Sequence, residues 1–276
     1  MRQRSMSMIA SVGAMTEDTV AEFGAMSLFT ARMFSWIFRS FTRWRLLAPQ
    51  LYEIGVRSLP VIFATGAFIG MVMAVQVYFQ LADLGYKQFA GLLINISVVK
   101  ELGPVLAGVM LAGRVGGSLS AELGTMKVTE QIDALTTLAA NPIRYLVVPR
   151  FLACLFLIPF LTVYCDCIGV LGGYAVVVWI YGGSAHDYWF YSQRSIETFD
   201  VLAGVSKSFL FGAVIALVSC YKGFNCKPGA EGVGRAATES FVLSFISILI
   251  INFFMAVFFK AFYGAIWGLV PRGMGS

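Results

Sequence analysis

Two adjacent charges, Lys100 and Glu101, lie inside an apolar segment with the composition of a membrane-spanning helix. A charge in the hydrocarbon core is costly, so it usually faces protein or water and marks a functional position. Pro104 cannot donate a hydrogen bond to the carbonyl of Lys100, so the helix should bend there and leave that carbonyl free. Two interpretations follow. The charges form a self-neutralising pair that fixes helix packing, or they form a polar wall for the head group of an amphiphilic substrate.

A second polar feature is the segment Gly124–Leu138, which follows that span. Val128, Ile132 and Leu135 recur at helical spacing, which predicts an amphipathic helix with one apolar stripe. The charged and amide side chains around this stripe are Lys127, Glu130, Gln131 and Asp133. This layout suits a docking surface for a soluble partner, and a plain solvated interfacial helix is the alternative.

Motifs of catalysis are missing from the chain. It has one histidine, no H-E-x-x-H, no G-x-S-x-G and no acid pair placed for catalysis. The glycine-rich loop Lys222–Glu239 matches neither a phosphate-binding loop nor a dinucleotide fingerprint. We therefore predict no catalytic residue, no metal site, no cofactor and no nucleic acid, and we disfavour a membrane-bound enzyme. Energy, if it is used, must come from another polypeptide.

The composition indicates the elements that position these residues. Hydrophobic residues make up 58% of the 276 residues, charged residues make up 13%, and the mean hydropathy is +0.79. Such a chain is an all-α, polytopic membrane protein. The five cysteines lie in or beside apolar segments, and we interpret them as small hydrophobic side chains.

Apolar stretches long enough to cross about 30 Å of hydrocarbon predict five spans. They cover approximately residues 59–79, 89–111, 145–181, 201–221 and 241–263. The third is long for one upright helix, so we interpret it as one long span, bent near Pro159 or near the glycines at 169, 172 and 173, with a re-entrant pair as the alternative. We assign residues 48–268 to one membrane domain, residues 1–19 to a poorly ordered extension and residues 269–276 to a tail. The tail includes LVPRG, which resembles a protease cleavage sequence.

Residues 20–47 have a face of phenylalanine, methionine and tryptophan with arginines around the remainder. This pattern predicts a helix lying in the membrane interface, and an ordinary amphipathic helix packed on protein is the alternative. The basic loop residues gather on the side of the N-terminus. The positive-inside rule therefore places the N-terminus in the cytoplasm and the C-terminus on the opposite side.

Three sequence blocks carry a resemblance to a known family. ELGPVLAGVMLAGRVGGSLSAELGTMKVTEQIDAL, NPIRYLVVPRFLA and YKGF…GAEGVGRAAT resemble the MlaE (YrbE) family of ABC-transporter permeases. The resemblance implies a homodimer in the inner membrane, with the C-terminus in the periplasm and a cytoplasmic coupling helix near Ala121–Leu135. It implies a separate cytoplasmic ATPase that uses ATP and Mg²⁺, an MCE-domain protein on the outer face, and phospholipids or related lipids as substrates.

Carried onto this chain, the resemblance suggests two sets of site residues. Candidates for lining a lipid cavity are Lys100, Glu101, Pro104, Val72, Val75 and Phe79. Candidates for coupling to the ATPase are Glu122, Lys127, Glu130, Gln131 and Asp133. Asn252 and Asp166 depart from the family's usual residues, which puts the charge distribution within the bundle in doubt. The alternative function is a stand-alone ion- or proton-coupled carrier with Lys100, Glu101 and Asp166 as a relay.

Overall fold

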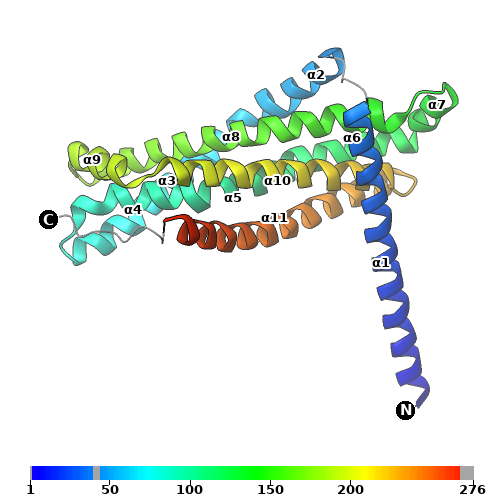
Figure 1. Ribbon diagram of the computed structural model, residues 1–276, viewed down its shortest axis with the longest axis horizontal. Helices are drawn as coiled ribbons and strands as arrows, with labels where there is room; N and C mark the ends of the chain where they lie inside the picture. The colour runs from blue at the N-terminus through cyan, green and yellow to red at the C-terminus, as the bar shows by residue number, and fades with distance from the viewer. Residues whose placement is uncertain (1, 40–43, 268–276) are drawn as a thin grey trace.

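The computed structural model describes residues 2–39 and 44–267, and all secondary structure in these ranges is helical. Five helices are long and apolar enough to cross a membrane, which confirms the predicted all-α membrane architecture. They run side by side in one elongated bundle (Figure 1). Their ranges are Trp44–Asp83, Lys87–Val128, Ile143–Ile180, Thr198–Phe224 and Ala230–Gly264.

The first two spans are built from several consecutive helical segments. The first comprises α2 (Trp44–Gly55), a 3₁₀ turn and α3 (Leu59–Asp83). The second comprises α4 (Ala90–Ser97), a π-helical turn η3 (Val98–Leu102), α5 (Gly103–Leu111), a π-helical turn η4 (Ala112–Gly116) and α6 (Gly117–Val128). The other three are α8 (Val148–Tyr174) with π-helical turns at both ends, α10 (Thr198–Phe224) and α11 (Ala230–Trp267).

The second span extends well beyond the apolar segment that identifies it. Its helix stays continuous from Lys87 to Val128, 42 residues, although the sequence turns polar after Leu111. Leu119 and Leu123 of α6 remain buried in the main hydrophobic core and so keep one face of the helix packed. The polar segment is therefore part of α6, which packs against α10 and α11.

The third span is one continuous helix from Ile143 to Ile180, which excludes the re-entrant pair. Pro159 lies inside α8 and does not end it. Neighbours pack on several sides of α8, namely α2, α3, α5 and α10. This central position explains why its most apolar stretch is more buried than that of any other described span.

Glycines allow α3 and α8 to approach closely. Gly66 and Gly70 of α3 face the carbonyl groups of Cys165 and Gly169 on α8, and a Cβ atom at either glycine would overlap those oxygens. Small residues spaced four apart commonly bring membrane helices into backbone contact. The sequence pattern Gly66-x-x-x-Gly70 thus marks a contact within the chain.

Helix α1 (Arg2–Arg39) crosses the long axis of the bundle near one end (Figure 1). It includes residues 2–19, where the sequence predicts a poorly ordered extension, because no proline interrupts the segment and methionine and alanine favour a helix. It ends at Arg39, and Trp44–Leu47, assigned to the same interfacial helix, belong to α2. The tail at residues 269–276 lies outside the described residues.

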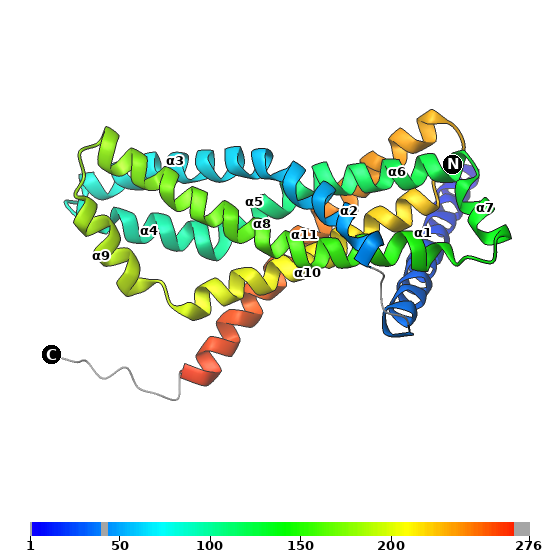
Figure 2. The ribbon, with the colours of Figure 1, turned by 90° about the horizontal axis from the view of Figure 1, so that it is seen from above.

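The two ends of the bundle differ in their connecting helices. Helix α9 (Ala185–Ser195) lies at one end, and α7 (Gln131–Thr137) lies at the other, near α1 (Figure 2). Buried hydrogen bonds hold α9 in place, since the Tyr188 hydroxyl donates to Asn95 Oδ1 at 2.7 Å and Asn95 Nδ2 donates to Ser192 Oγ at 2.8 Å.

Candidate functional site

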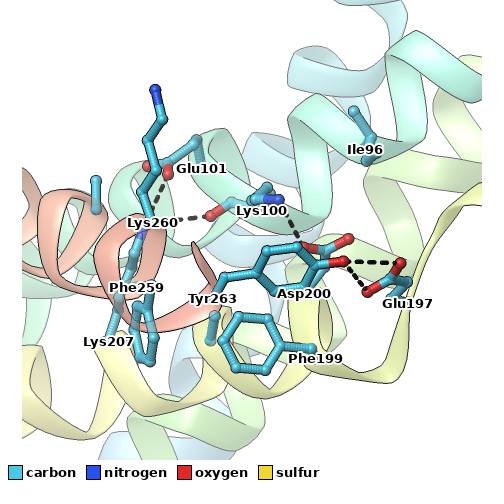
Figure 3. Close-up of a pocket in the computed structure, with 12 residues that line it drawn as sticks. Ile96, Lys100, Glu101, Glu197, Phe199, Asp200, Lys207, Phe259, Lys260 and Tyr263 are labelled. Atoms are coloured by element: carbon cyan, nitrogen blue, oxygen red, sulfur yellow. Dashed lines mark hydrogen bonds and ion pairs between the residues drawn. The ribbon is translucent and has the colours of Figure 1, made fainter. Parts of the chain in front are cut away.

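A polar cavity of about 510 Å³ lies between the second span, α10 and α11, in the part of α10 that follows α9 (Figure 3). Apolar and aromatic side chains form part of its wall, and charged side chains form the rest. The lining residues are Ile96, Lys100, Glu101, Glu197, Phe199, Asp200, Ala203, Lys207, Ala256, Phe259, Lys260 and Tyr263. Lys100 and Glu101, which the sequence singles out, are thus both cavity residues.

Lys100 pairs with a residue of α10. Its ammonium donates a hydrogen bond to Asp200 Oδ1 at 2.6 Å. The Asp200 side chain is only 9% exposed, whereas that of Lys100 is 48% exposed. The structure therefore gives Lys100 a carboxylate partner on α10 and does not pair it with its neighbour Glu101.

Glu101 pairs with a second residue of α10, Lys207, whose ammonium donates to Glu101 Oε1 at 2.8 Å. Asn252 of α11 also donates from Nδ2 to Glu101 Oε2 at 3.3 Å. The Lys207 side chain is 2% exposed, so its charge is almost fully removed from the surroundings. A cation this deeply buried in a span requires such a partner.

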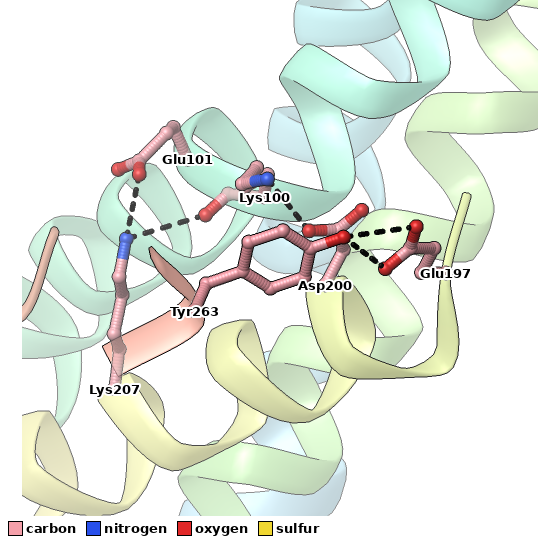
Figure 4. A network of polar contacts seen from close by, with 6 residues as sticks. All are labelled: Lys100, Glu101, Glu197, Asp200, Lys207 and Tyr263. Carbon is pink, nitrogen blue, oxygen red and sulfur yellow. Dashed lines mark hydrogen bonds and ion pairs between the residues drawn. The ribbon is translucent and has the colours of Figure 1, made fainter. Parts of the chain in front are cut away.

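The carbonyl that Pro104 frees also has a partner. Lys207 Nζ donates to the Lys100 carbonyl at 3.4 Å, and the backbone from Val98 to Leu102 forms a π-helical turn (Figure 4). Such π-helical turns are frequent at functional sites. The proline, the π turn and the Lys207 contact together place two charged residues of one helix opposite two of another.

The far part of α11 closes one side of the cavity. The Tyr263 hydroxyl donates to both carboxylate oxygens of Glu197, at 3.1 and 3.2 Å (Figure 4). The ring of Phe199 contacts those of Phe259 and Tyr263, with centroid separations of 5.9 and 5.4 Å. These contacts attach α11 to the beginning of α10.

Sequence reasoning missed the α10 half of this site. The predicted fourth span, residues 201–221, begins after Asp200, and Lys207 inside it is not identified as an intramembrane charge. Their separation of seven residues puts both on one face of a helix, two turns apart. One face of this apolar helix therefore carries an acid and a base, and the second span carries a base and an acid, Lys100 and Glu101. This complementarity is the sequence signal that could have identified both residues.

The remaining predicted lining residues do not border this cavity in the single chain. Pro104 is buried, and Val72, Val75 and Phe79 are exposed on α3. The ring of Phe79 contacts that of Tyr181 at a centroid distance of 5.1 Å. Their part in lipid binding stays a prediction.

At the opposite end of the bundle, the coupling segment is two helices and not one. Helix α6 ends at Val128, Glu130 takes a left-handed backbone conformation with φ 59°, and α7 begins at Gln131. This turn breaks the predicted apolar stripe, and within it only Ile132 is buried. The prediction of one amphipathic helix over Gly124–Leu138 is therefore wrong, because a residue in the left-handed conformation interrupts an α-helix.

The coupling candidates fall into two groups. Lys127 Nζ donates to Asp133 Oδ1 and Oδ2 at 2.9 and 3.0 Å, so an exposed ion pair spans the turn on which Glu130 and Gln131 lie. Glu122 instead accepts a hydrogen bond at 2.6 Å from Arg150, whose side chain is 5% exposed. Glu122 thus attaches α6 to the beginning of α8, whereas the other four lie on the surface at the end of the bundle.

The fold and cavity define the class of this molecule: a helical, multi-pass membrane protein with interhelical ion pairs beside a polar cavity. Comparison with known proteins identifies the family. The family described as Permease MlaE matches residues 47–258. The chain belongs to the MlaE permease family.

Several relatives cover most of the chain. A probable ABC transporter permease protein of Rickettsia conorii is 42% identical over 251 residues, which are 91% of this chain and 97% of the relative. The intermembrane phospholipid transport system permease protein MlaE of Haemophilus influenzae is 35% identical over 218 residues, 78% of this chain and 84% of the relative. The chloroplastic protein TRIGALACTOSYLDIACYLGLYCEROL 1 of Arabidopsis thaliana is 36% identical over 222 residues, 80% of this chain and 63% of the relative.

Proposed function

We propose that this chain is the permease subunit of an ABC transporter that moves phospholipids or related lipids between membranes. Family membership and the phospholipid transport named for the Haemophilus influenzae relative support this function. The structural observation that carries it is the cavity between the second span, α10 and α11. It combines fixed charges with apolar walls at one end of the spans.

The cavity chemistry suits the head group of an amphiphile. The half-exposed ammonium of Lys100 can meet a phosphate, and Ile96, Phe199 and Phe259 offer apolar contact beside it. A volume of about 510 Å³ is of the size that accommodates a head group and part of a chain. The exposed apolar face of α11, which includes Phe253 and Phe258, would accompany the acyl chains.

A separate cytoplasmic ATPase would drive transport with ATP and Mg²⁺. We assign its contact to the surface of α6 and α7 that carries Lys127, Glu130, Gln131 and Asp133, because charged side chains there are exposed at the end of a rigid helix. The charge distribution supports an inner-membrane protein with a cytoplasmic N-terminus and a periplasmic C-terminus. An MCE-domain protein would then meet the α9 end, and a second copy of the chain would complete a homodimer.

The function is tested by purifying the tagged chain from cells that also express the genes encoded beside it. We expect an ATPase and an MCE-domain protein to co-purify, and phospholipid to be extracted from the complex. Loss of phospholipid in Lys100→Ala, with the ATPase retained, would assign lipid binding to the cavity. A chain that purifies without an ATPase and without lipid would contradict the proposal.

One observation favours a second candidate, a stand-alone proton-coupled carrier. Asp166 of α8 is buried next to Gly103, and its Oδ1 has no hydrogen-bond partner in the described part of the chain. A buried carboxyl group in a span is a typical member of a proton relay. Transport driven by a proton gradient across liposomes that contain the purified chain alone would support this candidate.

A further inference from the structure

A second polar cavity, of about 210 Å³, lies at the α7 end of the bundle where α1, α10 and α11 meet. Three basic side chains and two carboxylates line it. The charged residues are Glu22, Lys222, Lys227, Arg235 and Glu239. The cavity is separate from the one beside Lys100, because α10 contributes its opposite end to each.

The two carboxylates share one lysine. Lys222 Nζ donates to Glu22 of α1 at 2.5 Å and to Glu239 of α11 at 3.0 Å, and the Lys222 side chain is only 13% exposed. Lys227 and Arg235 are exposed, and neither has a carboxylate within 4 Å among the described residues. These two cations therefore remain available to an anionic ligand.

The thiol that lines the cavity adds no negative charge. Burial raises the pKa of Cys226, although Lys127 opposes the shift. The thiol stays protonated at neutral pH as a result. The cavity keeps an excess of positive charge on the Lys227 and Arg235 side.

The level of the cavity along the bundle is set by α1. Phe29 of α1 contacts the rings of Tyr221 and Phe224 on α10, both with centroids 5.7 Å apart, and α1 crosses the bundle axis there (Figure 1). The sequence predicts that this helix lies in the membrane interface. Lys227 follows Phe224 by three residues, so that prediction puts the cavity at the level of the lipid head groups.

We propose that this cavity binds the phosphate of an anionic phospholipid in the cytoplasmic leaflet, with Lys227 and Arg235 as its contacts. Basic pockets between spans on the cytoplasmic side recognise anionic head groups. The bound lipid would join α1 to the α10–α11 connection and so complete the network centred on Lys222. The inference relies on the membrane orientation given for the proposed function and does not require that the chain transports lipid.

The test uses the full complex in nanodiscs of phosphatidylcholine, with or without added phosphatidylglycerol. For the wild type, we expect phosphatidylglycerol adducts in native mass spectra and a higher melting temperature. The double variant Lys227→Gln/Arg235→Gln should carry several-fold fewer phosphatidylglycerol adducts and lose most of the increase in melting temperature. Lys87→Gln/Arg194→Gln, which removes two charges at the α9 end, is the matched control and should respond as the wild type does.

Three results would overturn the proposal. The first is an unchanged phosphatidylglycerol response in the double variant. The second is an equal response of the wild type to inorganic phosphate without phosphatidylglycerol, which would make free phosphate the ligand. The third is loss of the ATPase from the double variant with lipid adducts unchanged, which would make the cavity a protein contact. None of these depends on transport, so a failure of the proposed function would be seen separately.

Discussion

The ion pairs beside the Lys100 cavity differ in exposure from the Lys127–Asp133 pair on the α6–α7 turn. Near α9, Lys207 is 2% exposed and Asp200 is 9% exposed, and each is paired with a charge on the second span. At the α7 end, Lys127 and Asp133 form a pair with side chains 37% and 56% exposed. Burial of a charge has a high desolvation cost, whereas an exposed pair costs and contributes little.

This difference separates two kinds of function. Charges retained inside the spans despite their cost must serve packing, a substrate or both, because an apolar replacement would be easier to bury. Charges on the surface of α6 and α7 can change without disturbing the fold, so they suit contact with a partner. We therefore predict that substitutions of the buried charges lower the stability of the protein, whereas substitutions on the surface of α6 and α7 weaken its contact with the ATPase.

The largest effect is expected at the buried pair. Glu101→Ala leaves the Lys207 ammonium without its carboxylate. Removing one partner of a buried ion pair lowers the free energy of unfolding by about 3–5 kcal/mol. We expect a strongly lowered melting temperature of the purified protein and little folded yield. The double variant Glu101→Ala/Lys207→Met, which removes both charges, should recover most of the stability. Equal instability of the single and double variants would show that the pair is not what stabilises this region.

A smaller change in stability is expected for Lys100→Ala, because Lys100 is half-exposed and Asp200 retains some access to the cavity. Its main effect should be a several-fold loss of co-purified phospholipid, measured by lipid extraction and mass spectrometry. Lys87→Ala, outside the cavity, is the control. Wild-type lipid content in Lys100→Ala would leave the Lys100–Asp200 pair with a packing role only.

At the α7 end, Asp133→Lys should change stability by no more than about 1 kcal/mol, since the Lys127–Asp133 pair is exposed. The same variant should lose the ATPase during co-purification, because it places two positive charges together on the proposed contact surface. Glu130→Lys should act similarly. A retained ATPase with normal lipid-stimulated hydrolysis in both variants would remove this surface from the account.

The smallest effect is expected on α3. Phe79→Ala removes one ring contact with Tyr181, and aromatic pairs contribute about 0.5–1.5 kcal/mol. We expect a slight fall in melting temperature and a smaller lipid loss than in Lys100→Ala. A greater lipid loss than in Lys100→Ala would make α3 the principal lining in place of the Lys100 cavity.

Periodicity and composition predict the existence of the five spans well, because apolar length alone decides whether a helix can cross a membrane. They predict the helix ends less well. The second helix continues through polar sequence to Val128 because Leu119 and Leu123 still pack on the core, and that contact depends on neighbours distant in sequence. The turn at Glu130 is likewise hidden, since glutamate is not a residue that usually marks a left-handed conformation.

The sequence predicts the half of the candidate site that lies on the second span and not the half that lies on α10. The cost of charges in lipid identifies Lys100 and Glu101, and Pro104 predicts the free carbonyl that Lys207 contacts. The sequence cannot pair them with Asp200 and Lys207, because pairing depends on the rotation of α10 against the second span. Glu122 illustrates the same limit, since its contact with buried Arg150 follows only from the packing of α6 on α8.

We propose that this permease moves lipid when a separate ATPase acts on it. Transfer of fluorescent phospholipid between proteoliposomes and acceptor vesicles tests it most directly, with the chain, its ATPase and its MCE-domain partner reconstituted together. We predict transfer that requires ATP and the ATPase, and that falls in Lys100→Ala and Asp133→Lys. Transfer by the chain alone under a proton gradient, independent of ATP, would contradict the account.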